Sequence, residues 1–228
     1  MSDDFVQSFA RGLAVIRAFD AHHTELGLSE VARRAELPRA AARRFLRTLE
    51  VLGYVHSDGK LFRLTPRVLE LGFAYLSALS LPEIAQPHLE RLSHELDESV
   101  SAAVLDGDDI VYVARVATRR IMSVGITIGT RFPAHQTSMG RVLLAASDVD
   151  ALPDVRAAGW ALADQELEPG LRAVAAPVRD RTGEVVAAVN VSTSAARTSI
   201  EQLREVYLPA LLRTTAAIER ELLAPDAV

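Results

Sequence analysis

Arginines at four-residue spacing are the residues of this sequence best suited to binding another molecule. Arg39, Arg43 and Arg47 fall on one face of a helix predicted to run from Pro38 to Leu52, because residues four apart lie about one helical turn apart. Like charges at this spacing repel one another, so this face requires solvent or a polyanion opposite it. Guanidinium groups are forked donors that match phosphate oxygens and guanine. Nucleic-acid binding and a solvated charged face are the two interpretations, and the neighbouring elements favour the first.

The segments before this helix are typical of a helix-turn-helix. A first helix is predicted over 7–21, and a second begins at Leu28, with Ser29 as its N-cap, and ends before Pro38. Pro38 suits the first turn of the third helix, and Gly53 suits the position just after its end. Three helices in this order, the last two joined by a tight turn, give the helix-turn-helix plan.

The apolar residues of these helices form the predicted core of this region. They are Leu13, Ile16 and Ala10 or Ala14 in the first helix, Val31, Ala32 and Ala35 in the second, and Ala41, Phe45, Leu46, Leu49 and Leu52 in the third.

A hairpin is predicted directly after the third helix. Residues 54–64 form two short alternating runs joined at Asp58-Gly59, where both residue types tolerate a positive φ. A hairpin in this position is a wing, and Lys60 and Arg63 would lie near a phosphate backbone. The residues expected to contact DNA are Ser29, Arg39, Ala40, Arg43, Arg44, Arg47, Lys60 and Arg63.

Charge and composition agree with a DNA-binding head. The 228 residues carry a formal net charge of −5, yet residues 27–67 contain 9 basic and 4 acidic side chains. The chain has no cysteine, which excludes disulfides, thiolate metal sites and a cysteine nucleophile. The acidic first residues and the lack of a run of about 18 apolar residues predict a cytoplasmic protein without membrane contact.

Residues 65–80 are predicted to form a helix that links this head to the rest of the chain. Thr65 and Pro66 suit its start. Its apolar stripe of Val68, Leu69, Phe73, Leu76 and Leu79 needs a partner, which is either a dimer mate or another part of the same chain. A dimer would suit DNA binding, because two heads that bind a palindrome add their binding energies.

The remaining sequence alternates between helical and strand patterns. Helices are predicted over 82–97, 137–146 and 199–223, and strands over 101–105, 110–116, 121–128, 159–163, 173–178 and 185–192. Strands that are mostly antiparallel and flanked by helices indicate an α+β class with a sensor-like second domain.

Two polar features of this second domain could bind a small acid. Thr137, Ser138, Met139 and Gly140 open a helix, whose free amides and positive dipole end suit a carboxylate; N-capping by Thr137 or Ser138 is the simpler explanation. Asn190 and Ser192 lie two apart on one strand and so share a face. Polar groups on a buried face need partners, which a ligand could supply.

Motifs of enzyme catalysis are missing from the sequence. The six histidines (His22, His23, His56, His88, His94 and His135) show no metalloprotease spacing, and there is no nucleophile elbow, P-loop or dinucleotide fingerprint. Asp106, Asp108 and Asp109 fall in a turn, whose chemistry explains them. We therefore expect no catalytic residue, metal or cofactor. The alternatives are a small-molecule-binding enzyme, or a sensor without gene control, that carries an accessory DNA-binding domain.

Several stretches in this order resemble the IclR family of bacterial transcription regulators. They are RGLAVIRAF, LSEVARRAELPRAAARRFLRTLEVLGYV, FRLTPRVLELG, SVSAAVLDGDDIVYVARV, PAHQTSMGRVLLA and ELEPGLRAVAAPVRDRTGEVVAAVNVS. The run from 65 to 134 is also similar to the subgroup that controls β-ketoadipate-pathway genes and responds to aromatic acids such as protocatechuate or 4-hydroxybenzoate, or to their ring-cleavage products. The resemblance implies a winged helix-turn-helix domain (5–66), a linker helix (67–80) and a GAF-like α/β domain for effector binding and oligomerisation (81–226).

The resemblance also implies an effector pocket. The expected lining residues are Arg120, Thr137, Ser138, Met139, Gly140, Ala163, Ala173, Asn190 and Ser192. Alanine at 163 and 173 replaces polar residues of the family member that binds small keto acids, which implies a larger, less polar pocket suited to an aromatic acid. Arg115 and Arg119 are further candidates for binding a carboxylate. Glu166, Glu168 and His135 are expected nearby in structural or exposed roles.

The resemblance implies both partners and one departure from the family. The expected partners are double-stranded operator DNA, a small organic acid and further copies of the chain in a homodimer or dimer of dimers, with ligand binding changing the disposition of the subunits through residues 65–80. Between Ala146 and Gly159 the family has about 25–30 more residues than this chain. Either the chain has a deletion or residues are missing from the sequence; we favour the second, because the remnant shows no evident turn or cap.

Overall fold

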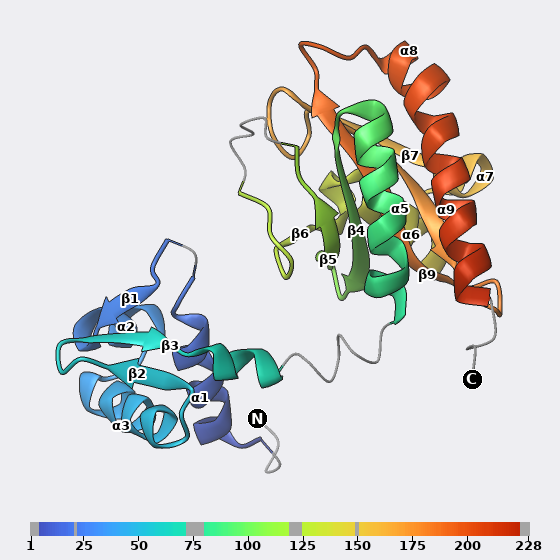
Figure 1. Cartoon of the computed structure of the whole chain (residues 1–228). Helices are drawn as coiled ribbons and strands as arrows, with labels where there is room; N and C mark the ends of the chain where they lie inside the picture. The colour runs from blue at the N-terminus through green and yellow to red at the C-terminus, as the bar shows by residue number, and fades with distance from the viewer. Residues whose placement is uncertain (1–4, 21, 72–79, 119–124, 149–150, 224–228) are drawn as a thin grey trace. The chain divides into compact units, whose positions relative to one another are not determined.

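The computed structural model describes residues 5–20, 22–71, 80–118, 125–148 and 151–223. The chain divides into two compact units, Met1–Ala78 and Leu79–Val228. Figure 1 shows a small unit of helices and a short sheet, and a larger unit in which helices cover a long twisted sheet.

The N-terminal unit packs three helices against a three-stranded antiparallel sheet. The helices are α1 (Gln7–Arg17), α2 (Leu28–Arg34) and α3 (Arg39–Val51). The strands are β1 (Glu25–Gly27), β2 (Val55–Ser57) and β3 (Leu61–Leu64), in the order β1-β3-β2. Val15, Val31 and Leu46 are fully buried, so each helix contributes a side chain to one core. This arrangement is the winged helix-turn-helix that the sequence predicts.

Turn residues act in this unit as expected. Gly53 follows α3 with φ of +82°, and Gly59 turns the β2–β3 hairpin with φ of +95°, both in the left-handed region that favours glycine. Asp58 does not need a positive φ; its Oδ1 accepts from the backbone amides of Lys60 and Leu61, both at 2.8 Å. These bonds hold the pKa of Asp58 below its usual value and fix the tip of the wing.

Five details of the N-terminal predictions are wrong. Helix α1 ends at Arg17, and it buries Val15, whereas Leu13 is 42% exposed. Gly27 caps α2, so Ser29 lies inside the first turn and is exposed. Leu52, placed in the core, is 50% exposed. The segment taken as a polar break contains β1, which pairs with β3; strands this short leave almost no periodic signal.

The C-terminal unit is built on a six-stranded antiparallel sheet in the order β6-β5-β4-β9-β8-β7. The strands are β4 (Ser99–Asp106), β5 (Asp109–Val116), β6 (Arg131–Pro133), β7 (Ala161–Asp164), β8 (Leu171–Arg179) and β9 (Val185–Ser194). Helices α5 (Ser80–Leu96) and α9 (Leu208–Leu223) cover one face, and α6 (Ser138–Ser147) packs against the other. This is the α/β arrangement expected of the second domain.

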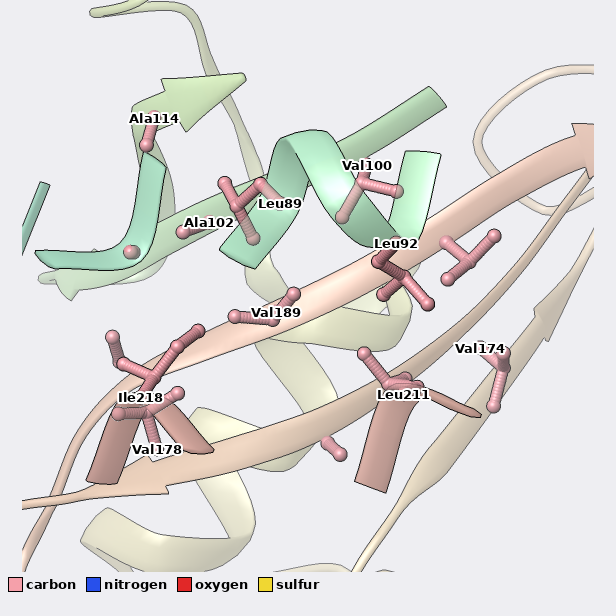
Figure 2. Packing of buried hydrophobic residues seen from close by; sticks show 14 of the residues in the cluster. Leu89, Leu92, Val100, Ala102, Ala114, Val174, Val178, Val189, Leu211 and Ile218 are labelled. Carbon is pink, nitrogen blue, oxygen red and sulfur yellow. The ribbon is translucent and has the colours of Figure 1, made fainter. Parts of the chain in front are cut away.

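Side-chain alternation decides what each sheet face buries. Val189 and Val191 of β9 pack with Leu89, Leu92 and Leu211 from α5 and α9 in the larger core. Figure 2 shows this layer, in which Val100, Ala102, Val174 and Val178 of the neighbouring strands meet the two helices. Because successive residues of a strand point to opposite faces, the residues between these valines face α6.

Three C-terminal segments differ from the predictions. Residues 125–128 are not a strand; the partner of β5 is β6, paired through Ile110 and Phe132. The short connection after α6 forms α7 (Pro153–Ala158), which ends at Gly159 with φ of +72°, so the remnant has the cap that the sequence analysis did not find. The final helix contains α8 (Ile200–Gln202), a π-helical turn at Leu203–Tyr207 and α9.

The predicted linker helix is described only at its start. A 3-10 helix, η1 (Pro66–Leu69), has Thr65 at its N-cap position and Pro66 at its first position. Val68 is half-buried and Leu69 is 75% exposed. Phe73, Leu76 and Leu79 lie outside the described residues. Among those described, no helix is long and apolar enough to span a membrane.

Gly140 of α6 lies in close contact with the backbone of Ala134, so a substitution at this position tests how tightly the second unit is packed. A Cβ at this position would lie 2.1 Å from the backbone oxygen of Ala134, in the short helix η2 (Ala134–Gln136). We expect Gly140→Ala to lower the free energy of unfolding by about 2–3 kcal/mol, because backbone must move to admit the methyl group. Urea denaturation followed by circular dichroism measures this change. Gly125→Ala is the matched control, since nothing lies within 4 Å of its Cβ; equal effects of the two changes would contradict the packing argument.

Candidate functional site

Helix α3 presents the arginine face that the sequence predicts. Arg39, Arg43, Arg44 and Arg47 are all exposed, as is Ala40. In the described part of the chain none of these four arginines forms an ion pair. Other arginines of the same unit do: Arg33 pairs with Glu30, Arg34 with Asp20, Arg63 with Glu25 and Arg67 with Glu70. The four guanidinium groups of α3 are therefore not compensated by carboxylates of the described residues, and neither are the charges of Arg11, Arg17 and Lys60.

The remaining predicted DNA contacts lie around α3. Lys60 is exposed at the tip of the wing and Ser29 is exposed on α2. Arg63 is exposed too, but its Nη1 lies 3.5 Å from Glu25 Oε1, which reduces the positive charge that it offers. The missed strand β1 brings Glu25 opposite Arg63 in the sheet. A patch of unpaired guanidinium groups next to a hairpin can bind a phosphate backbone and bases.

Ionic contacts and hydrogen bonds connect the end of α1 to α2, the helix that precedes α3. Arg34 Nε donates to the carbonyl oxygen of Ala18 at 2.6 Å, and the same guanidinium pairs with Asp20. The side chain of His23 hydrogen-bonds Asp20, and together with the His22 amide and Arg34 it lowers the Asp20 pKa to about 2. These contacts tie the end of α1 to α2, which positions the helix before the turn.

The second candidate site is a cavity between the sheet and the start of α6. It is partly open to solvent, and its volume of about 360 Å³ includes that open space. Its lining residues come from β5, α6, β7, β8, β9 and the loops beside them: Tyr112, Ile126, Gln136, Thr137, Ser138, Ala163, Glu166, Leu167, Leu171, Ala173, Asn190 and Ser192. Six of the nine residues predicted for an effector pocket are among them.

Strand register explains why distant residues meet here. Ser192 pairs with Ala173 across β9 and β8, and Ala173 pairs with Ala163 across β8 and β7. Asn190 lies two residues before Ser192 on the same face. All four therefore point toward α6, away from the core drawn in Figure 2.

Buried polar atoms without partners mark this cavity. Ser138 is 1% exposed and Asn190 is 4% exposed. Asn190 Nδ2 donates to Ser192 Oγ at 3.1 Å, but Asn190 Oδ1 and Ser138 Oγ have no hydrogen-bond partner among the described residues. Buried polar groups in proteins are nearly always satisfied, so unsatisfied ones facing one cavity call for a ligand or water.

The start of α6 is only partly available to a ligand. Thr137 Oγ1 accepts from the Gly140 amide at 2.9 Å, which is the capping role considered for it. Met139 and Gly140 do not line the cavity, and the space beside Gly140 is filled by Ala134 rather than left for a ligand. Arg120 and Arg119 lie outside the described residues.

Several lining residues were missed by the sequence analysis. Tyr112 is 3% exposed, and burial raises the pKa of its hydroxyl to about 12; its place on the inward face of β5 follows from alternation and could have been found. Glu166, expected nearby, lines the cavity and receives Arg141 Nη1 at 2.9 Å. Leu167 comes from the loop before β8 and Leu171 from the first position of β8, and their place at the cavity follows only from the fold. His135 lines a separate hollow beside α7.

Two family descriptions match the chain. Residues 8–59 match the IclR helix-turn-helix domain. Residues 73–153 and 149–220 match the C-terminal region of the bacterial transcriptional regulator IclR.

Relatives and solved structures agree with these matches. The Pca regulon regulatory protein of Pseudomonas putida is 46% identical, over 92% of this chain and 81% of its own length. The p-hydroxybenzoate hydroxylase transcriptional activator of Acinetobacter baylyi is 34% identical, over 93% and 91%. A candidate transcriptional regulator from Rhodococcus sp. RHA1 is 54% identical, with a TM-score of 0.83 over 96% and 98% of the two chains. The inducer-binding domain of PobR from Acinetobacter, solved with 3-hydroxybenzoic acid as a double mutant, is 28% identical, with a TM-score of 0.57 over 60% and 97%.

The matches also locate the shortened connection. The C-terminal description matches in two pieces that meet at 149–153. The alignment with the Pseudomonas protein spans 237 positions but uses 92% of the 228 residues, about 210, so about 27 positions have no residue in this chain. In this structure helix α7 closes that connection.

Proposed function

The chain belongs to the IclR family of bacterial transcriptional regulators, and from that premise we propose that an aromatic acid bound in its C-terminal cavity controls its binding to operator DNA. It is a regulator with a helix-turn-helix DNA-binding domain, and its relatives are transcription regulators rather than enzymes. We propose in addition which residues bind DNA, which residues bind the ligand, what class of ligand it is, and how the chains assemble.

For DNA, α3 is the recognition helix and the β2–β3 hairpin is the wing. The observation that carries this proposal is the row of exposed arginines on α3 that lack ion pairs. Arg39 lies at the N-terminal end of the helix, where recognition helices contact bases. Lys60 at the wing tip would contact phosphate and add affinity without reading sequence.

Replacing Arg43 and Arg47 by alanine tests the recognition helix. We expect operator affinity to fall at least about 100-fold, because two guanidinium contacts to bases or phosphate are lost. The slope of log affinity against log salt should fall by about 2 if both contact phosphate. Fluorescence polarisation with the promoter DNA of its own gene measures both quantities. Arg213→Ala is the control, because Arg213 pairs with Glu95 in the C-terminal unit; unchanged affinity of the double variant would rule out α3 as the recognition helix.

For the ligand, the cavity supports an aromatic acid. Its walls include Leu167, Leu171, Ala163 and Ala173, which are apolar surfaces against which a flat ring would pack. Ser138 and Asn190 supply polar atoms that need partners. The relative from Acinetobacter baylyi is the p-hydroxybenzoate hydroxylase transcriptional activator, and the double mutant of the PobR inducer-binding domain was solved in complex with 3-hydroxybenzoic acid.

Thermal unfolding in the presence of aromatic acids tests the ligand class. We expect 4-hydroxybenzoate, 3-hydroxybenzoate or protocatechuate to raise Tm, with stabilisation of about 2.7 kcal/mol at 100 times Kd. Ala173→Leu should abolish the Tm shift, because the larger side chain fills the cavity. Leu212→Ala, on an exposed site of α9, is the control. The absence of a Tm shift with these acids and their ring-cleavage products, or turnover of any of them, would favour the alternative of an enzyme or unrelated sensor.

For assembly, we propose that the chain forms a homodimer or a dimer of dimers. Phe5, Phe9 and Leu13 are 53%, 68% and 42% exposed at four-residue spacing on and before α1, so they form one apolar stripe. Apolar stripes of this kind are typical of contact surfaces. Two heads in one assembly would bind two half-sites of a palindrome.

Sedimentation equilibrium tests the α1 stripe. Phe9→Glu should weaken self-association at least about tenfold, because a carboxylate would be buried in the contact. Gln7→Glu adds the same charge to an exposed residue on the opposite face of α1 and should leave association unchanged. Equal association of the two variants would show that the stripe is not an assembly surface.

A further inference from the structure

We propose that Arg115 supplies the counter-charge for the carboxylate of the effector, so that the acid group lies over β4 and β5 while the ring extends toward β8. This inference rests on the proposed function, since it assigns an orientation to the ligand of that cavity. The sequence offers two places for the acid group, the start of α6 and a set of arginines that includes Arg115, and the geometry favours Arg115.

The sheet register places Arg115 beside the cavity. Ser101 of β4 pairs with Arg115 of β5 on one side and with Asn190 of β9 on the other. Paired residues of neighbouring strands point to the same face, so all three face α6. Arg115 Nη1 donates to Ser101 Oγ at 2.9 Å, which holds the guanidinium over β4. Arg115 is not itself a lining residue, but its guanidinium is held over β4, one strand spacing of about 4.8 Å from β9, whose Asn190 lines the cavity.

Arg115 is a partly buried cation that lacks a counter-ion. Its Nε is buried and has no acceptor among the described residues, and none of their carboxylates pairs with its guanidinium. Burial lowers the pKa of Arg115, but a guanidinium remains charged in proteins. Removing a charge from water without pairing it is costly, so an anion at this position would be bound strongly.

Other arginines near the sheet show what Arg115 lacks. Arg131 pairs with Asp106 and Asp109, Arg141 with Glu166, Arg172 with Asp164, and Arg197 with Glu98. Each of these has its carboxylate within the described residues. Arg115 instead has one neutral hydroxyl as its side-chain acceptor. The missing carboxylate is the one that an acid ligand carries.

The opposite end of the cavity disfavours a carboxylate. Glu166 lines it there, in the loop between β7 and β8, and its charge is already matched by Arg141. An acid group at that end would meet a second negative charge. Between the two ends, on β9, Asn190 Oδ1 has no donor among the described residues and can accept from a hydroxyl on the ring. The charges of the two ends therefore give the ligand one orientation.

The test compares an acid with its neutral amide on Arg115 variants. Calorimetry would measure Kd for 3-hydroxybenzoate and 3-hydroxybenzamide with the full chain, with Arg115→Gln and with Arg115→Lys. We expect the unaltered protein to prefer the acid, Arg115→Gln to weaken acid binding about 30-fold while amide binding changes less than about threefold, and Arg115→Lys to restore part of the preference. Arg213→Gln is the control for general loss of charge, since Arg213 is exposed and distant in sequence.

Each outcome bears on one level of the proposal. If Arg115→Gln weakens acid and amide binding to the same extent, Arg115 contributes only to the shape of the site, and the carboxylate assignment is overturned. Equal acid binding by Arg115→Gln and the unaltered protein would overturn it while leaving the proposed function intact. Failure of the unaltered protein to bind either compound would contradict the proposed ligand class, and the inference with it. The Tm of ligand-free Arg115→Gln should not fall, because a charge without a counter-ion is removed; a marked fall would show that Arg115 is structural.

Discussion

The strict alternation of side chains along β9 is the constraint on which the C-terminal unit depends. Val189 and Val191 face α5 and α9, while Asn190 and Ser192 face α6. A shift of register by one residue would place both polar side chains in the apolar core and both valines in the cavity. The sheet can bury polar groups on one face because the other face supplies a continuous apolar core. The polar side chains proposed to contact the ligand therefore belong to the same strand that supplies the apolar core.

Arginines that lack a carboxylate partner among the described residues occur in two different environments in this protein. On α3 the guanidinium groups are exposed, so water solvates them at little cost until a polyanion displaces it, and such binding is sensitive to salt. Arg115 is partly buried, so water cannot solvate all of its donors and a single anion is enough to match it. Exposure thus separates a surface suited to a polymer from a site suited to one small molecule.

The sequence predicts well those features that depend on neighbouring residues. Gly53 and Gly59 lie where a positive φ is needed, Thr137 caps α6, and the 3.6-residue period places the α3 arginines on the exposed face. It fails where tertiary context decides. Strand β1 is too short to show a period, and Val15 rather than Leu13 is buried because the partner elements fix the rotation of α1. The sequence names Arg115 among its candidate arginines, but its contact with Ser101 and its register with Asn190 depend on other strands.

Communication between ligand and DNA requires that the ligand bind the DNA-bound and free states with different affinity, and by linkage the same factor applies in both directions. The first residues of the connecting segment are attached to the end of α3 in a way that suits this requirement. Thr65 Oγ1 donates to the carbonyl oxygen of Gly53 at 2.5 Å, and Arg67 Nη1 donates to that of Leu52 at 2.9 Å, while its guanidinium lies over the ring of Tyr54. Carbonyls at a helix end have no partner within the helix, so these bonds also satisfy α3 itself. A force on the connector would consequently reach the recognition helix at its C-terminal end, without passing through the wing.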